Sequence, residues 1–547
     1  MKKRWAIFIL AALLVSSLPA CGSRSSGSDS SESVESVDLG GILNEDGRYD
    51  PEITIMLGSA QDANEEEIDG QTSKDNVWID AYRDELGITF EDMFVVNSEQ
   101  LEEKLNLQIA SGQVPDLMAV SRTQFEMLVE SGLAADLTEV YEQYASEKTK
   151  EYLNSDGGIC MDMSTVDGRL YAIPCTQGYL ESPGVVTWIR KDWLDNLNLD
   201  VPETYEELYE VMRAFTFEDP DGNGLDDTYA INTSNELDEW MGFFASYGSY
   251  PKSWILDDNQ EIVYGGIQPE TRNALEALNT MFEEGMISRE FGANDWNQFI
   301  KSIDNSNVGI VYFAWYAVSW PLGDVHTNAG AEWIPLPILS VDGGVAKVMG
   351  NAGPDTYYVM RKDYEHPEAL ILMCNLWFEK GYGSREDMLK YHKNEKEEMI
   401  ANFSPVHPWL AHEDVDYYCQ IRDALAGEDV GEMFPSCQTY YEVVQRYMEN
   451  PNEDDYFTYK MYGPDSGCAV LDYYMQNDLV LFEQYYGSGT ETMKEKWGLL
   501  ETKQLETYVK IIMGEEPIEA FDTFVEEWKS NGGDTITQEV REASENG

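Results

Sequence analysis

Between residues 101 and 120, the pattern of hydrophobic and polar positions changes from the spacing of a helix to that of a buried strand. Leu101, Leu105 and Ile109 fall four residues apart, which is the spacing of one face of a helix. Gly112 stands where a helix needs a left-handed residue to end. A turn follows, and residues 117–120 then form an apolar run that is too short for a helix and typical of a buried parallel strand. The pattern predicts a helix that feeds a buried strand, which is half of a βαβ unit.

Both patterns recur along the chain. Short apolar runs predict buried strands at residues 53–57, 93–96, 185–189, 262–264, 308–313 and 357–360. Amphipathic runs predict helices at residues 121–132, 204–215 and 269–282, and the pattern is mostly helical from residue 367 onward. Strands that alternate with helices predict an α/β fold. Because 547 residues are too many for one hydrophobic core, we expect at least two lobes.

Several short segments resemble one protein family. They are Ala110-Ser111-Gly112-x-x-Pro115-Asp116, Leu133 to Thr138, Asp167 to Pro174, and Gly285-Met286-Ile287. The sequence of these segments resembles that of the family 1 extracellular solute-binding proteins of bacterial ABC importers, in particular of their oligosaccharide-binding branch. The resemblance runs over nearly the whole chain from Ile53. It implies a two-lobed fold like that of type II periplasmic binding proteins, with an interlobe cleft and a helical C-terminal region.

The resemblance and the composition together predict the domain boundaries. We expect a signal peptide over residues 1–20 and a lipidated flexible linker over residues 21–48. Lobe 1 is expected over residues 49–180 with a return at about 305–355, and lobe 2 over residues 181–304 with a return at about 356–547. Small residues from Gly350 to Pro354 suit a hinge crossing between the lobes.

The N-terminal segment has the pattern of an export signal. Basic residues 2–4 precede an apolar run from Trp5 to Val15, and Leu18-Pro19-Ala20-Cys21 is a lipobox-like site, so Cys21 is the expected lipidation and palmitate site. An ordinary signal peptide or a membrane anchor is the alternative, but the run is shorter than the roughly 20 residues of a spanning helix. Residues 22–37 are almost entirely Ser, Gly and acidic, which predicts a tether. We expect the protein on the extracellular face of a bacterial cell membrane.

The charge of the chain narrows its partners. A formal net charge of −66 excludes a generic nucleic-acid binder, which needs a basic surface. The same field disfavours polyanionic ligands unless a local basic cleft overrides it. Of seven cysteines, six remain beside Cys21, and they could form three disulfides in many pairings. None has CxxC spacing, so a zinc site is not expected.

One acidic loop has the spacing of a calcium site. Oxygen-bearing side chains alternate at 219, 221 and 223, Gly224 allows a sharp turn, and a carboxylate returns at 227. The loop lacks the glutamate that closes an EF-hand, so Asp227 would serve instead, as in the alginate-binding members of the family it resembles. The alternative is an Asx-rich turn that binds nothing. The predicted ligands of a structural Ca²⁺ are Asp219, Asp221, Asn223, the carbonyl of Leu225, and Asp227.

Aromatic side chains at strand exits and in polar surroundings are candidates for sugar contacts, because pyranose C–H faces stack on such rings. Loops after buried strands border the expected cleft. The predicted ligand-binding residues are Trp240, Tyr247, Trp315, Tyr316, Tyr358 and Asn76. Trp240 and Tyr247 could equally be core residues. Arg190 and Lys191 could form an anion site, but a structural pairing with neighbouring acids is favoured.

Catalytic signatures are absent from the sequence, which contains no HExxH, GxSxG, Walker A or GxGxxG motif. His407 and His412 flank Trp409, and we interpret them as solvated or core-edge residues and not as a base. The predicted function is therefore capture of an oligosaccharide by a lipid-anchored monomer that delivers it to the membrane subunits of an ABC permease. The alternatives are a surface-anchored polysaccharide-degrading enzyme and a peptide-binding or sensor-presenting protein.

Overall fold

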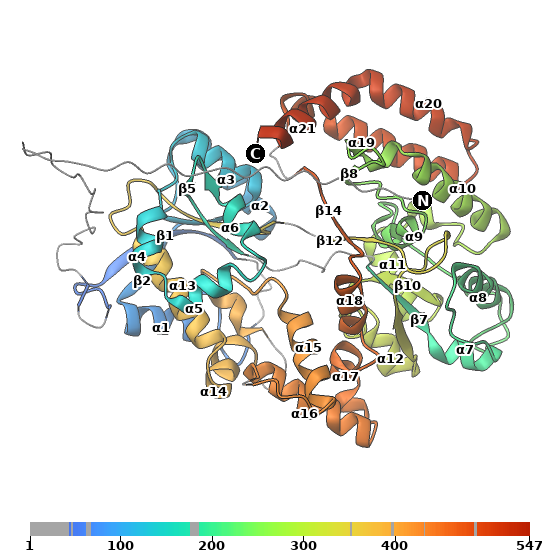
Figure 1. Cartoon of the computed structure of the whole chain (residues 1–547), viewed down its shortest axis with the longest axis horizontal. Coiled ribbons are helices and arrows are strands. Elements are labelled where there is room, and N and C mark those ends of the chain that lie inside the picture. The colour runs from blue at the N-terminus through green and yellow to red at the C-terminus, as the bar shows by residue number, and fades with distance from the viewer. Residues whose placement is uncertain are drawn as a thin grey trace, which may run out of the picture. The chain divides into compact units, whose positions relative to one another are not determined.

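The computed structural model of the chain describes residues 43–44, 47–61, 67–175, 185–350, 353–394, 399–431, 433–485 and 489–546. The predicted signal peptide, Cys21 and nearly all of the predicted linker lie outside these residues. The α/β fold class is confirmed, since strands and helices alternate through the first half of the chain and helices dominate its C-terminal part (Figure 1).

The first sheet has five strands in the order β2-β1-β3-β13-β6. Its strands are β1 (Ile53–Ala60), β2 (Ile88–Val96), β3 (Leu117–Val120), β6 (Ile173–Cys175) and β13 (Thr356–Met360). Strand β1 runs parallel to β2 and β3, whereas β13 runs antiparallel to β3 and β6. Side chains alternate along β13, so Tyr357 and Val359 enter one hydrophobic core while Tyr358 and Met360 enter another on the opposite face.

The predicted unit at residues 101–120 is present. Helix α2 (Ser98–Ser111) ends before Gly112, whose φ of 69° is the left-handed conformation that the pattern requires, and β3 follows. The next helix begins at a capping box in which the Ser121 hydroxyl accepts the N–H of Gln124 and the Gln124 side chain accepts the N–H of Ser121.

Apart from α13 (Glu368–Gly381), the remaining helices near the first sheet are short. They are α1 (Val77–Ala81), η1 (Tyr82–Leu86), α3 (Arg122–Glu130), α4 (Thr138–Tyr144), α5 (Glu147–Leu153), α6 (Ile159–Met163), α13 (Glu368–Gly381), α14 (Arg385–Asp387), η5 (Met388–His392) and η6 (Ile400–Phe403), with a hairpin of β4 (Thr165–Val166) and β5 (Arg169–Leu170). Helix α13 is buried in the core of this sheet, which also receives Trp409 and Leu410. The described residues from 356 to 394 and from 399 to 410 therefore belong to the lobe of the first sheet.

The second sheet is antiparallel, with β7 (Val186–Arg190) between β10 (Ile310–Phe313) and β11 (Trp333–Leu336). Around it lie α7 (Lys191–Leu197), α8 (Tyr205–Phe217), η2 (Asp238–Trp240), α9 (Met241–Ser246), η3 (Gly265–Ile267), α10 (Pro269–Glu284), η4 (Phe291–Ala293), α11 (Trp296–Asp304), α12 (Gly323–Ala329) and the hairpin of β8 (Trp254–Leu256) and β9 (Ile262–Tyr264).

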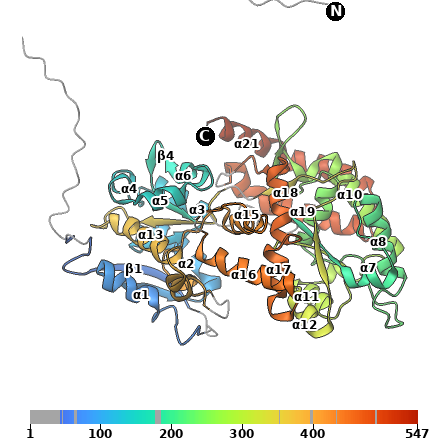
Figure 2. The same cartoon turned by 60° about the horizontal axis from the view of Figure 1, so that its bottom comes forward.

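C-terminal helices share the core of the second sheet. They are α15 (Glu413–Leu425), α16 (Pro435–Glu449), η7 (Glu453–Asp455), α17 (Tyr456–Tyr462), α18 (Gly467–Gln476), α19 (Glu491–Ile512), α20 (Glu519–Trp528), η8 (Lys529–Gly533) and α21 (Asp534–Asn546). Both views show α15 to α17 between the elements of the first sheet and those of the second (Figures 1 and 2). Two short strands, β12 (Val348–Gly350) and β14 (Val480–Phe482), pair in parallel where the chain passes between these groups.

The predicted lobe returns are wrong in part. Residues 305–355 were assigned to lobe 1, but β10 and β11 both pair with β7 of the second sheet. Residues from 356 onward were assigned to lobe 2, but β13 pairs with β3 and β6 of the first sheet. Only from about Glu413 does the chain return to the core of the second sheet. The physical reason is that an apolar run specifies burial and not which distant strand it will pair with.

Candidate ligand-binding site

A cavity of about 690 Å³ is the candidate site, and its volume is typical of sites for small molecules. It is lined by the residues that follow β10, by segments next to η5 and before α15, and by helices α15 to α18. Aromatic lining residues are Trp315, Tyr316, Trp409, Tyr417, Tyr440, Phe457 and Tyr462, and polar ones include Ser319, His392, Lys393, His412, Glu413, Asp414, Asp454 and Thr458.

Trp315 and Tyr316 lie at the exit of β10, as the sequence predicts. The Trp315 ring meets the Tyr316 ring edge to face at 5.5 Å and lies 5.6 Å from the Tyr462 ring. The backbone of Trp315 also approaches Gly467 so closely that a Cβ there would lie 2.1 Å from the Trp315 carbonyl oxygen. Trp315 is thus fixed by the C-terminal helices, and the site needs segments that are far apart in the sequence.

Tyrosine hydroxyls hold the carboxylates of the cavity in place. The Tyr462 hydroxyl donates to Asp414 at 2.5 Å, and the hydroxyls of Tyr382 and Tyr417 donate to the two oxygens of Glu413 at 2.5 and 2.7 Å. Burial raises the pKa of the Asp414 carboxyl group, while its hydrogen bond from Tyr462 and the nearby Lys393 ammonium group favour the ionised form. Oriented carboxylates accept hydrogen bonds, and the hydroxyl groups of a sugar can supply them.

The histidines of the cavity are uncharged at neutral pH. Burial lowers the pKa of His392 to about 3, and neither of its ring nitrogens has a hydrogen-bond partner. Burial also lowers the pKa of His412. Lys393 supplies an ammonium group, which donates to the Tyr440 hydroxyl at 3.4 Å. The described lining therefore combines aromatic faces, carboxylate acceptors and the amino-group donor of Lys393.

Four of the six predicted ligand-binding residues do not line this cavity. Trp240 is 0% exposed, and its indole N–H donates to the carbonyl of Asn232 inside the core of the second sheet. Tyr358 is buried in the first sheet and accepts the backbone N–H of His407. Tyr247 is half-buried and its hydroxyl bonds with that of Tyr205.

Asn76, the fourth of these residues, caps a helix. Its side-chain oxygen accepts the N–H groups of Trp78 and Ile79 at the start of α1, and its amide donates to the carbonyl of Thr72. A capping side chain has its hydrogen-bonding capacity committed, so Asn76 is a structural residue here. Residues 62–66, in the loop that follows the first predicted strand, lie outside the described residues.

Sequence reasoning missed most of the cavity. His412 was interpreted as a solvated or core-edge residue, Trp409 was named only as its neighbour, and Glu413, Asp414, Phe457 and Tyr462 were not singled out. They lie in or next to C-terminal helices whose pattern indicates helix without indicating which face meets a distant strand exit. The density of aromatic and acidic residues between 409 and 462 was the available signal.

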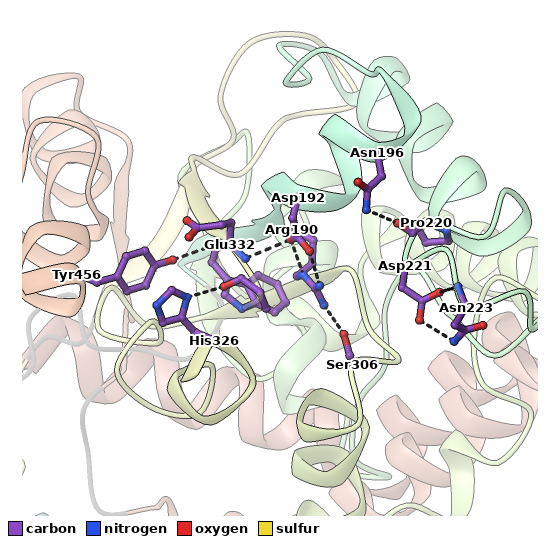
Figure 3. A network of polar contacts seen from close by, with 12 residues as sticks. Arg190, Asp192, Asn196, Pro220, Asp221, Asn223, Ser306, His326, Glu332 and Tyr456 are labelled. Atoms are coloured by element: carbon purple, nitrogen blue, oxygen red, sulfur yellow. Dashed lines mark hydrogen bonds and ion pairs between the residues drawn. The ribbon is translucent and has the colours of Figure 1, made fainter. Parts of the chain in front are cut away.

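The predicted calcium loop brings its acidic side chains close together. The Asp219 carboxylate accepts the N–H of Gly224 at 3.1 Å. The Asn223 amide donates to Asp227 at 3.2 Å and to Asp221 at 2.7 Å, and Figure 3 shows the contact with Asp221. Burial, with the neighbouring carboxylates of Asp219 and Asp227, raises the pKa of Asp221.

This loop does not form a metal cage as it stands. Among the described residues, no group of three or more His, Cys, Asp and Glu side chains is arranged to hold a metal ion. The donor chemistry fits Ca²⁺, which prefers oxygen ligands, but the Asn223 amide donates where a cation between Asp221 and Asp227 would lie. The backbone N–H of Leu225, whose side chain is exposed, donates to the Asn223 oxygen. For calcium to bind here, the Asn223 side chain must turn its oxygen, in place of its amide nitrogen, toward Asp221 and Asp227.

The structural interpretation of Arg190 is supported by its contacts. Its guanidinium group donates to both oxygens of Asp192 at 2.8 and 2.5 Å and to the Ser306 hydroxyl at 2.6 Å (Figure 3). It also lies over the rings of Trp193 and Trp333. With 3% exposure, this arginine is a buried link between β7, α7 and the loop before β10 and does not present a free anion site.

The chain belongs to the bacterial extracellular solute-binding protein family, because the model of that family matches residues 65–373, which is more than half of the chain. Members of this family are binding proteins, and the prediction that the chain is not an enzyme is confirmed by the relatives found. The resemblance stated from the sequence is likewise confirmed.

Curated relatives carry names that concern carbohydrates or lipoproteins. The polygalacturonan/rhamnogalacturonan-binding protein YtcQ of Bacillus subtilis is 25% identical over 81% of this chain and 83% of its own length. Lipoprotein LipO of B. subtilis is 28% identical over 40% of this chain and 42% of its own length. The fructooligosaccharide substrate-binding protein FusA of Streptococcus pneumoniae is 25% identical over 46% of this chain and 48% of its own length.

Solved structures share the fold. Alginate-binding protein AlgQ2, in a form without calcium ion, has a TM-score of 0.56 at 17% identity and covers 90% of this chain and 98% of its own. An EF-hand mutant of FusA in complex with fructo-nystose has a TM-score of 0.57 at 15% identity, over 90% of this chain and 99% of its own. An HMO-binding solute-binding protein of Bifidobacterium longum infantis has a TM-score of 0.60 at 14% identity and covers 90% of this chain and 98% of its own. The two-lobed binding-protein fold is thereby confirmed.

Proposed function

We propose that the protein captures an oligosaccharide in the cavity at Trp315 and delivers it to an ABC permease. One observation carries this proposal: the cavity presents aromatic faces beside carboxylates that tyrosine hydroxyls hold in place. Stacking on the rings and hydrogen bonds from sugar hydroxyls to the acids are the chemistry that such a lining offers. The names of YtcQ and FusA support a carbohydrate ligand.

A thermal-shift screen over oligosaccharides tests the proposal. A bound ligand stabilises the native state by mass action, so the melting temperature should rise with ligand concentration. Chromatography of the same mixtures should show intact ligand, because a binding protein releases no product. If no oligosaccharide raises the melting temperature, the proposed function is wrong, and if shortened glycans accumulate, the alternative of a degrading enzyme is correct.

Membrane attachment through Cys21 is part of the proposal. The lipobox-like sequence before Cys21 and the name of lipoprotein LipO support it. None of the helices in the described residues combines the length and apolar character needed to cross a membrane. We expect Cys21→Ala to move the protein from the membrane fraction into the medium. Incorporation of labelled palmitate into the wild type is the direct measurement, and its absence would contradict the anchor.

We further propose that the loop from Asp219 to Asp227 binds a structural Ca²⁺. Carboxylates that repel one another favour a cation, and the similar structures include AlgQ2 without calcium ion and an EF-hand mutant of FusA. The residues that would hold it are Asp219, Asp221, Asn223 and Asp227, with the Leu225 carbonyl. The ion would neutralise the loop, and it has no part in ligand contacts because none of these residues lines the cavity.

The calcium proposal predicts a metal-dependent melting temperature. Free Ca²⁺ should raise the melting temperature of the wild type, and Asp221→Ala combined with Asn223→Ala should abolish that rise without changing sugar affinity. Asp226→Ala is a matched control in the same loop, outside the expected ligand set. Equal melting temperatures with calcium and with chelator, together with no metal by elemental analysis, would show that the loop is only a turn.

A further inference from the structure

We infer that the cavity selects neutral oligosaccharides and discriminates against those that carry uronic acids. This inference rests on the proposed function and names the substrate class of the same cavity. Three lining residues are carboxylates, namely Glu413, Asp414 and Asp454, whereas Lys393 is the one Lys or Arg side chain among the described residues that line it. The relative YtcQ is named for binding polygalacturonan, which is built of uronic acids, so the inference separates the ligand of this chain from the one in that name.

Two of the three carboxylates in the described lining, those of Glu413 and Asp414, are fixed as acceptors. Glu413 receives two tyrosine hydroxyls and Asp414 receives one, so these acids are positioned inside the cavity and not extended into solvent. An ionised carboxylate accepts hydrogen bonds and donates none. A neutral sugar offers hydroxyl donors to such groups, whereas the carboxylate of a uronic acid offers only acceptors and adds like-charge repulsion.

The cations that could recognise a uronate are few. Arginine binds carboxylates through two parallel hydrogen bonds, but no arginine is found among the described lining residues. Arg446, on the neighbouring helix α16, is committed to Asp455 through a hydrogen bond of 2.7 Å and a second, shorter contact. The ammonium group of Lys393 already acts on Asp414, whose negative charge it favours.

The two histidines among the described lining residues, His392 and His412, do not change the balance of positive and negative charge in the cavity. Burial lowers the pKa of both His392 and His412, so both rings are neutral at pH 7. His392 has two ring nitrogens without a partner and is 5% exposed, which makes it a neutral polar group available to a hydroxyl. The described lining is therefore net negative, and the formal charge of −66 on the whole chain repels a polyanion as it approaches.

Paired ligands that differ only in charge test the inference. Oligogalacturonides, oligomannuronates and glucuronate-substituted xylo-oligosaccharides are each compared by calorimetry at pH 7 with their carboxyl-reduced counterparts, which keep linkage and length. Within any pair that binds, the neutral member should bind at least about tenfold more tightly, since like charges in a cavity oppose binding. A uronate that binds as tightly as its reduced counterpart overturns the inference while leaving the proposed function intact. If neither these pairs nor any oligosaccharide of the thermal-shift screen binds, the proposed function itself is wrong.

Salt and one variant supply independent readouts. Added NaCl should strengthen uronate binding relative to neutral binding, because it screens the repulsion. Asp414→Asn keeps the shape of the side chain and an acceptor for Tyr462. In this variant the ratio of the Kd for the uronate to the Kd for its neutral counterpart should fall several-fold. Glu449→Gln also removes one negative charge, at an exposed residue at the end of α16, and should leave the ratio of the two Kd values unchanged. An unaltered ratio in both the salt series and the Asp414→Asn variant overturns the inference.

Discussion

Replacing Trp315 with alanine is expected to weaken oligosaccharide binding by about 1–3 kcal/mol, which is roughly a 5- to 150-fold rise in Kd. The indole ring lines the cavity and packs against Tyr316 and Tyr462, so its removal takes away a stacking face and loosens a neighbouring one. Isothermal titration calorimetry with the best ligand of the thermal-shift screen measures this loss directly.

Stability and affinity must be separated in this experiment. Trp315 is 6% exposed, so the alanine variant also loses packing. Tyr316→Ala, at a partly exposed lining residue, should lose affinity with less destabilisation. Trp240→Ala provides the opposite control, because a fully buried tryptophan outside the cavity should cost about 3–5 kcal/mol of unfolding free energy without a specific loss of affinity. Unchanged Kd in both Trp315→Ala and Tyr316→Ala would remove this strand exit from the site.

Trp240 and Trp315 show why sequence reasoning found only part of the site. Both are tryptophans next to apolar runs, and no local feature says which one meets a cavity. The distinction comes from tertiary contacts: η2 places Trp240 against Phe291 inside the core, whereas β10 ends beside helices α17 and α18. Asn76 was similarly ambiguous, since a polar residue before a helix is as often a cap as a ligand contact.

Local structure was predictable because it depends on nearby residues. The helix and strand at residues 98–120, the left-handed Gly112 and the Ser121 cap all follow from spacing and capping chemistry. The strands at 310–313 and 356–360 were also predicted, but their partners were not. Two apolar runs of similar length are equivalent in the sequence, and pairing is decided by long-range register and topology. The lobe returns were therefore wrong although the strands were right.

The Arg190 cluster explains how the second sheet tolerates a buried charge. Burial of a guanidinium group costs free energy unless every donor is satisfied, and here Asp192 and Ser306 accept from it while Trp193 and Trp333 cover its faces. Asp192 in turn accepts the backbone N–H of Glu332 at 3.2 Å, which ties the start of α7 to the segment before β11 (Figure 3). One residue thus links three segments of the lobe.

Arg190→Ala should therefore lower the unfolding free energy by about 3–5 kcal/mol, because it leaves Asp192 without its partner and opens a gap between two indole rings. Urea unfolding of purified protein measures the change. Arg190→Lys should recover only part of the loss, since an ammonium group cannot reproduce the paired hydrogen bonds to Asp192. Lys191→Ala is the matched control: its pair with Asp195 is exposed, so the expected change is about 0–1 kcal/mol.

Sugar affinity should be unchanged in all three variants at temperatures where they are folded, because neither residue lines the cavity. A loss of ligand binding in Arg190→Ala at wild-type stability would mean that Arg190 is a binding residue and that the structural interpretation is wrong.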